Sequence, residues 1–347
     1  MTAYGSTSRL AHRLALANPA IAEAAFDMER LAVGRNVPPA SPNGHVFVTG
    51  LARAGTTILM RALHTTGAFA SLTYRHMPFV LAPKLWGSVS RRFVSSSAPT
   101  LRAHGDRIMI DTDSPEALDE VFWRVNAGTD YIGGDALVPH AVDDETMDRF
   151  AAYVGLVLHA EQRSRYLTKN NNNILRLGAL LDRFTGSDFL VPFREPVQHA
   201  LSLRKQHHHH CAIQSADPFV RDYMTWLAHH EFGLDHRPFR FGHAGQTTGD
   251  PAELNYWLRH WIAYHDHLLS HHADRPSLTL VCYEDLCADP GVWAGLTHRL
   301  DLKCDALPAF QIAAPHPADE IDPVLEDRAQ RLYERMRMLA RAAHGSS

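Results

Sequence analysis

A short loop bounded by two glycines is the first part of this sequence whose residue types suggest chemistry. Gly50 and Gly55 enclose the loop, and the apolar run 46–48 before it is typical of a buried parallel strand. Apolar residues recur at helical spacing after the loop, which predicts a helix beginning near Thr57. The start of a helix carries unpaired N–H groups and a partial positive charge. We therefore expect this loop to bind a phosphate or sulfate group.

The position of the cation in the loop indicates which anion it could hold. The glycine spacing is that of the nucleoside-triphosphate loop, G-x-x-x-x-G-K-[ST], but Thr56 stands at the lysine position. Arg53, inside the loop, supplies a cation instead. This displacement argues against a kinase or ATPase and favours a different phosphorylated donor. A P-loop kinase of a small metabolite and a non-catalytic nucleotide-binding protein of the same fold remain the alternatives.

A second candidate anion site follows the predicted strand 188–193. Arg194 stands at the carboxyl end of that strand, where open α/β sheets bind their ligands. Pro196 suits the first turn of a helix, and Ser202 follows Arg194 by eight residues, about two helical turns. A guanidinium at the strand end and a hydroxyl on the next helix can together hold a second phosphate.

Strands and helices must alternate to place these residues at one edge of a sheet. The candidate strands are 46–48, 107–110, 166–169, 188–193 and 278–282. The candidate helices are 115–124, 144–165, 218–230, 251–272 and 321–343, with one more between positions 169 and 188. This alternation predicts an α/β fold with a central parallel sheet. The region 204–277 contains no good strand, so we expect its helices to cover one end of the sheet and shape an acceptor cleft.

These motifs together resemble the sulfotransferase family, whose donor is 3′-phosphoadenosine 5′-phosphosulfate (PAPS). In that family the first loop holds the 5′-phosphosulfate, and an arginine and a serine at this spacing hold the 3′-phosphate. The stretch Tyr283-Glu284-Asp285-Leu286 after the last strand also looks like a motif of the family. The positions that correspond to the donor-binding residues are Arg53, Ala54, Gly55, Thr56, Thr57, Arg194 and Ser202.

The resemblance implies a P-loop-like three-layer sandwich with an additional helical segment over the active-site edge, and a sulfuryl transfer to a hydroxyl or amine. It runs from about Gly44 to Pro290. We expect one domain, 1–347, with a helical lead (1–43), a donor-binding core (44–203), a helical acceptor region (204–277) and a final strand with C-terminal helices (278–347). Ala54 departs from the family, which usually has serine there. The Arg-x-Gly-Thr-Thr loop is closest to a bacterial branch.

The transfer requires a general base, since neutral hydroxyls are poor nucleophiles. Cytosolic members of the family use a histidine after the strand that ends here at Lys169, where this chain has asparagines at 170–173. His76 is the leading candidate and Glu116 the next, followed by His104, Asp106 and Asp113. Lys169 follows an apolar strand, so its ammonium could neutralise the transferred sulfonate, as a lysine near this place does in some branches. The alternative for Lys169 is a solvated surface residue.

Composition excludes several other classes. The 347 residues carry a net charge of −4, which gives no overall attraction to nucleic acid. The four cysteines form no CxxC pair, and the histidine run 207–210 lacks metal-site spacing, so no metal is expected. No apolar run is long enough to span a membrane, and a cytoplasmic protein is the default. The acceptor stays open among small molecules, saccharides and peptides, and the oligomeric state stays unknown.

Overall fold

The computed structural model describes most of the chain. The described residues are 5–33, 37–93, 100–101, 109–110, 113–242, 247–303, 308–312 and 321–345. The strands are β1 (Asn43–Val48), β2 (Thr100–Leu101), β3 (Met109–Ile110), β4 (Leu167–Lys169), β5 (Gly186–Phe193) and β6 (Leu278–Cys282). The helices of the first half are α1 (Ser6–Leu16), α2 (Pro19–Ala32), α3 (Thr56–His64), η2 (Tyr74–His76), α4 (Pro83–Phe93), α5 (Glu120–Tyr131) and α6 (Asp144–Glu161). Those of the second half are η3 (Asn171–Arg176), α7 (Leu177–Arg183), α8 (Pro196–Ala216), α9 (Pro218–Trp226), α10 (Leu254–His272), α11 (Tyr283–Ala288), α12 (Pro290–Arg299) and α13 (Pro323–Gly345).

Four parallel strands form the central sheet in the order β4-β1-β5-β6. Val48 pairs with Lys169 on one side and with Leu190 on the other, and Phe193 pairs with Cys282. The carboxyl ends of the strands therefore meet at one edge, with the end of β1 between those of β4 and β5. This is the edge where open α/β sheets bind their ligands.

Helices cover both faces of the sheet, which confirms the predicted α/β sandwich. On one face Val46, Val48 and Leu190 of the sheet are fully buried. They belong to the same buried apolar cluster as Leu59 of α3 and Trp293 of α12. On the other face Phe47 stacks on Phe189, with ring centres 4.7 Å apart and planes 9° apart. Alternate residues of a strand point to opposite faces, so a strand buried on both sides reads as the continuous apolar run seen in the sequence.

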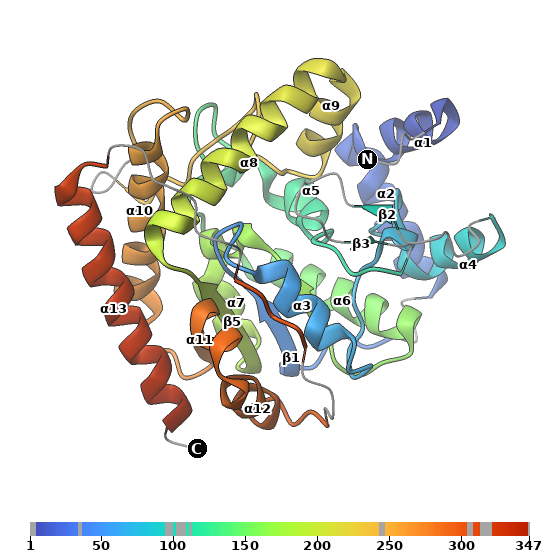
Figure 1. Cartoon of the computed structure of the whole chain (residues 1–347). Coiled ribbons are helices and arrows are strands. Elements are labelled where there is room, and N and C mark those ends of the chain that lie inside the picture. The colour runs from blue at the N-terminus through green and yellow to red at the C-terminus, as the bar shows by residue number, and fades with distance from the viewer. Residues whose placement is uncertain are drawn as a thin grey trace.

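The remaining helices surround this sandwich. Figure 1 shows α1, α2 and α4 on one side of the molecule and α10 and α13 on the other. The long helix α8 leaves the end of β5 and leads to α9 (Figure 1). Within the described residues, no helix is both long and apolar enough to cross a membrane.

Several predicted element bounds were wrong. The described part of the predicted strand 107–110, β3, pairs antiparallel with β2 in a separate two-stranded sheet, so it is not a strand of the central sheet. The helix expected at 115–124 begins only at Glu120. Pro115 instead bridges to Thr73, and the Glu116 amide donates to the carbonyl oxygen of Leu72 at 3.1 Å, which holds this segment extended.

Two other helices end earlier than predicted. Helix α6 ends at Glu161 because Gln162 adopts a left-handed conformation, with φ 53°. Helix α9 ends at Trp226 rather than at position 230, and Ala228 has φ 54°. The second change matters for the site, because it leaves His229 to Glu231 outside the helix.

Candidate functional site

The glycine-bounded loop connects β1 to α3 at the carboxyl edge of the sheet. Helix α3 begins at Thr56, and Gly55 before it has φ 90°, in the left-handed region. A Cβ atom on Gly55 would lie 2.5 Å from Cδ2 of Tyr283, so both the conformation and the close approach require glycine. Arg53 also has positive φ, 70°. For a residue with a side chain, this conformation costs about 1–3 kcal/mol and persists only where the surroundings hold it.

Three of the predicted donor-binding residues contact one another. The Arg53 side chain donates from Nε to Oγ of Ser202 at 3.2 Å. Arg194 donates from Nη1 to the main-chain oxygen of Arg53 at 3.2 Å. The two predicted anion sites are therefore one continuous site, built from the loop after β1, the end of β5 and the first turns of α8.

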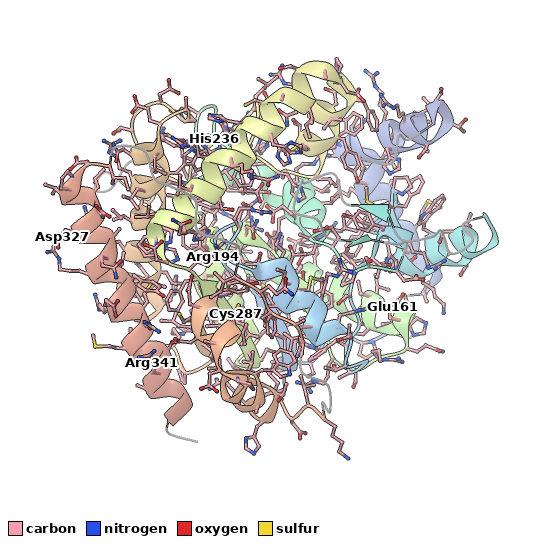
Figure 2. The ribbon with its side chains drawn as sticks, viewed as in Figure 1. Glu161, Arg194, His236, Cys287, Asp327 and Arg341 are labelled. Atoms are coloured by element: carbon pink, nitrogen blue, oxygen red, sulfur yellow. The ribbon has the colours of Figure 1, made fainter. Side chains whose placement is uncertain are left out.

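Arg194 is held with part of its guanidinium uncommitted. Its carbon Cζ lies 5.7 Å from the ring centre of Tyr283, a cation–π contact. Its Nε is buried and finds no hydrogen-bond partner among the described residues. A buried N–H donor without a partner is costly, and a bound anion would supply that partner. Figure 2 shows Arg194 between α8 and α3.

The predicted stretch that begins at Tyr283 fixes the start of α8. The carboxylate of Glu195 caps this helix, accepting from the amides of Val197 and Gln198 at 3.2 and 2.7 Å. The amide of Glu195 itself donates to Oε1 of Glu284 at 3.0 Å. Oε2 of Glu284 accepts from the Tyr333 hydroxyl of α13 at 3.2 Å. These bonds set the direction in which Arg194, the residue before Glu195, leaves the sheet.

A buried polar network holds the end of β4. Asp119 accepts from the Thr168 hydroxyl at 2.9 Å and from the Asn170 amide at 3.2 Å. Arg176 forms a bidentate ion pair with Glu120 at 3.0 and 3.1 Å. Burial, followed by the charge of Glu120, raises the pKa of Asp119 to about 7. Oδ1 of Asn170 also accepts from the Asn172 amide at 2.9 Å, so Asn170 caps the short helix η3 after β4.

Lys169 faces the site together with a carboxylate that the sequence analysis missed. By alternation with Thr168, the Lys169 side chain lies on the α3 face of the sheet, and the residue is 7% exposed. Asn171 donates to Oε1 of Glu231 at 2.9 Å. Burial raises the pKa of Glu231, but the charges of His229 and Lys169 and the bond from Asn171 outweigh it, so the pKa is below its ordinary value. Glu231 is thus an ionised carboxylate above the end of β4.

Both ring nitrogens of His76 contact neighbouring groups. Its Nδ1 accepts from the Thr73 amide at 3.0 Å, and its Nε2 lies 3.2 Å from Oε1 of Glu161 at the end of α6. Glu161 and Arg194 are well separated in the view of Figure 2. His76 is 1% exposed. Ala70 forms a parallel bridge with Tyr166, so the segment that leads to Thr73 and His76 runs beside β4 toward its carboxyl end.

Two of the other candidate bases, Glu116 and Asp113, are held by side-chain contacts. Glu116 is buried and accepts from the Tyr74 hydroxyl at 2.8 Å and from the Ala117 amide at 3.0 Å. Asp113 forms a bidentate ion pair with Arg75 at 2.6 and 2.7 Å, which lowers the pKa of Asp113. His104 and Asp106 lie outside the described residues.

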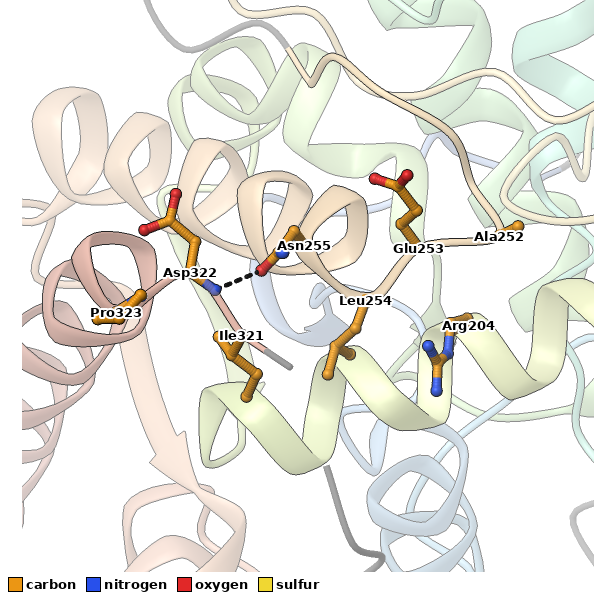
Figure 3. A pocket seen from close by; sticks show the side chains of 8 residues that line it. All are labelled: Arg204, Ala252, Glu253, Leu254, Asn255, Ile321, Asp322 and Pro323. Carbon is orange, nitrogen blue, oxygen red and sulfur yellow. Dashed lines mark hydrogen bonds between the residues drawn. The ribbon is translucent and has the colours of Figure 1, made fainter. Parts of the chain in front are cut away.

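A pocket opens on the side of α8 that faces α10 and α13. It has a volume of about 570 Å³, and Figure 3 shows Arg204 on one wall with Glu253 and Asp322 on the others. Leu254 and Ile321 supply its apolar surface. Arg204 follows Ser202 by two residues on α8, so the two side chains leave the helix on different faces.

The histidine run lies within α8, where His207 and His210 are buried. His207 accepts from the Gly233 amide at 3.3 Å, and burial lowers its pKa to about 4. Among the described residues, no three His, Cys, Asp or Glu side chains are grouped as metal ligands would be.

A central parallel sheet flanked by helices, with a glycine-bounded loop between β1 and α3, places the protein in the P-loop-like α/β class. A sequence model described as "Sulfotransferase family" matches residues 45–239, more than half of the 347 residues. The chain therefore belongs to the sulfotransferase family, as the sequence motifs indicated. No curated protein matches the sequence.

Solved structures of bacterial sulfotransferases resemble the fold. Sulfotransferase STF1 from Mycobacterium tuberculosis aligns with a TM-score of 0.51 and 15% identity, covering 93% of this chain and 84% of that one. Sulfotransferase STF9 from Mycobacterium avium aligns with a TM-score of 0.48 and 12% identity, covering 96% of this chain and 79% of that one. At such identities the likeness to STF1 supports the fold and says nothing of the acceptor.

Proposed function

We propose that this sulfotransferase takes its sulfuryl group from PAPS and transfers it to a hydroxyl or amine. The observation that carries the proposal is the contact of Arg53 with both Ser202 and Arg194 at the start of α3. This arrangement joins two cations, a hydroxyl and a helix N-terminus, which suits a donor with phosphates at two places. The buried, unpartnered Nε of Arg194 fits the same ligand.

The strand order suggests how the donor lies. The loop after β1 has β5 on one side and β4 on the other. A donor held by the loop and by Arg194 would extend over β5, away from β4. The sulfonate end then faces β4, where Lys169 and Glu231 lie. We therefore propose that the acceptor enters from the β4 side.

The proposed step is an in-line displacement at sulfur. The acceptor oxygen or nitrogen forms a bond to sulfur while the bond between sulfur and the 5′-phosphate oxygen breaks, and the bisphosphate leaves. Arg53 and the amides of Gly55 to Thr57 would stabilise the charge that develops on the leaving phosphate. Lys169 would neutralise the oxygens of the transferred group. The acceptor proton passes to a carboxylate, and we propose Glu231 for that role.

We prefer Glu231 to His76 and Glu116 as the base because of the groups that it contacts. It contacts Asn171, directly beyond the end of β4, and interacts with Lys169. Both ring nitrogens of His76 are instead engaged, Nδ1 by the Thr73 amide and Nε2 by Glu161. Glu116 remains the second candidate because it follows a segment that extends the sheet beside β4.

The test is transfer of labelled sulfur from PAPS to a panel of small-molecule, saccharide and peptide acceptors. Incorporation of label into one acceptor class would support the proposed transfer. Loss of that incorporation in Glu231→Gln would also support Glu231 as the base. Loss in Glu116→Gln with full activity in Glu231→Gln would transfer the role to Glu116. Donor binding without transfer to any acceptor would favour the non-catalytic alternative, and phosphate transfer from ATP would favour the kinase.

A further inference from the structure

A fully buried histidine, His199, connects the anion-binding loop to helix α10. His199 is 0% exposed and lies one turn into α8. Its Nε2 is 2.8 Å from the main-chain oxygen of Ala52, and its Nδ1 is 3.1 Å from Nε1 of Trp261. Neither contact is required to build the sheet or to cap a helix.

The partners of the ring determine where its proton lies. A carbonyl oxygen only accepts and an indole N–H only donates, so Nε2 must carry the hydrogen and Nδ1 must be the acceptor. Burial, followed by the charge of Arg194, keeps the pKa of His199 well below its ordinary value. The ring is therefore neutral and donates to Ala52 throughout the physiological pH range.

The hydrogen bond from His199 to the Ala52 carbonyl oxygen fixes the main chain next to Arg53. Ala52 directly precedes Arg53, the residue with φ 70°. The peptide group before the Arg53 Cα is held through the Ala52 oxygen by His199, and the peptide group after it is held through the Arg53 oxygen by Arg194. Both planes that define the left-handed conformation of Arg53 are thus fixed from outside the loop.

We propose that His199 is a positioning residue for the donor, which holds the anion-binding loop in its binding conformation and connects it to Trp261 of α10. The inference rests on the proposed PAPS donor. His199 acts through the main chain of the loop and makes no contact with the reacting atoms. Trp261 in turn packs on His265, with ring centres 4.1 Å apart, so the connection continues along α10 in the region expected to shape the acceptor cleft.

The experiment measures calorimetric affinity for the product bisphosphate, 3′-phosphoadenosine 5′-phosphate (PAP). His199→Met fills the ring's volume without a donor, and we expect it to raise the Kd for PAP about tenfold. In His199→Gln the amide nitrogen can still donate to Ala52, so we expect a Kd within about threefold of the wild type. His260→Met is the matched control, because His260 is a buried histidine of α10 stacked on Phe239, without a contact to the loop.

The outcomes separate the inference from the proposed function. Equal PAP affinity in His199→Met and the wild type would overturn the inference alone, as would a loss of the same size in His199→Gln or in the His260→Met control. Failure of the wild-type protein to bind PAP would overturn the proposed donor and the inference with it. If His199→Met does not fold, the test rests on His199→Gln, which keeps the hydrogen bond to Ala52. A tenfold loss of PAP affinity in His199→Gln would then overturn the inference, and retained affinity would support it.

Discussion

The guanidinium of Arg194 donates to the main-chain oxygen of Arg53 at 3.2 Å, so one arginine of the candidate donor site holds the backbone of the other. Arg53 has a left-handed conformation, and its own side chain contacts Ser202. The contact explains why two motifs about 140 positions apart in the chain behave as one site. It also makes the consequences of changing either residue testable.

Arg194→Ala should weaken PAP binding about 30-fold while the fold persists. Charge-assisted hydrogen bonds to a buried anion contribute about 1.5–3 kcal/mol, and Arg194 also supports the Arg53 carbonyl. Calorimetric titration with PAP measures the change. Arg299→Ala is the control, because Arg299 pairs with Asp188 near the opposite end of β5. Unchanged affinity in Arg194→Ala would refute the assignment of the second anion site.

Gly55→Ala should abolish detectable PAP binding and lower the melting temperature. The added Cβ would lie 2.5 Å from the Tyr283 ring, and the φ of 90° is unfavourable for alanine. Gly67→Ala is a matched control, since Gly67 has φ 72° but no atom within 4 Å of an added Cβ. It should show the conformational cost alone, about 1 kcal/mol, and normal affinity. Equal effects of the two substitutions would show that contact with Tyr283 is unimportant.

Glu231→Gln should reduce kcat by about 10²–10³ without changing PAP affinity. The amide can still accept from Asn171 but cannot take a proton. The pKa of Glu231 is lowered in the folded protein, so the wild-type carboxylate is ionised at neutral pH. Activity should therefore be lost only as pH falls through that lowered pKa. Glu23→Gln on the surface of α2 is the control. A kcat near that of the wild type in Glu231→Gln, measured with an accepted acceptor, would contradict the role.

The folded protein should lose stability on mild acidification. Burial lowers the pKa of His236 and His265 to about 3 and of His260 to about 4, whereas the unfolded chain binds these protons near pH 6.5. The unfolded state thus binds more protons below pH 6.5, and stability falls from there toward pH 4. At pH 5.5, one unit below the ordinary histidine pKa, each such histidine accounts for about 1 kcal/mol.

Melting temperatures at pH 7.5 and 5.5 measure this effect. His260→Phe should reduce the difference between the two pH values, because the phenyl ring can stack on Phe239 without titrating. His271→Gln, at an exposed position, should leave the difference unchanged. A melting temperature that is the same at both pH values would contradict the expected proton uptake.

The meeting of the candidate donor residues was predictable because they lie on the elements that the sequence marks most clearly. Parallel strands end at one edge, so the loop after β1 and Arg194 after β5 were expected to meet there. Glu231 was not predictable, because its contact with Asn171 joins positions 60 residues apart through a turn after α9. The apolar pattern predicted that helix α9 extends to position 230. No feature of the sequence indicates that Ala228 adopts the left-handed conformation that follows the end of the helix. Glu116 was placed in a helix because pairing of its amide with Leu72 is a tertiary contact.

The comparison of PAP with ATP–Mg in calorimetric titrations of the wild-type protein tests the central claim most directly. The account predicts saturable binding of PAP and no comparable binding of ATP–Mg, because Thr56 replaces the lysine that would hold a triphosphate and Arg194 with Ser202 provides a site for a second phosphate. Tight binding of ATP–Mg together with no binding of PAP would contradict it.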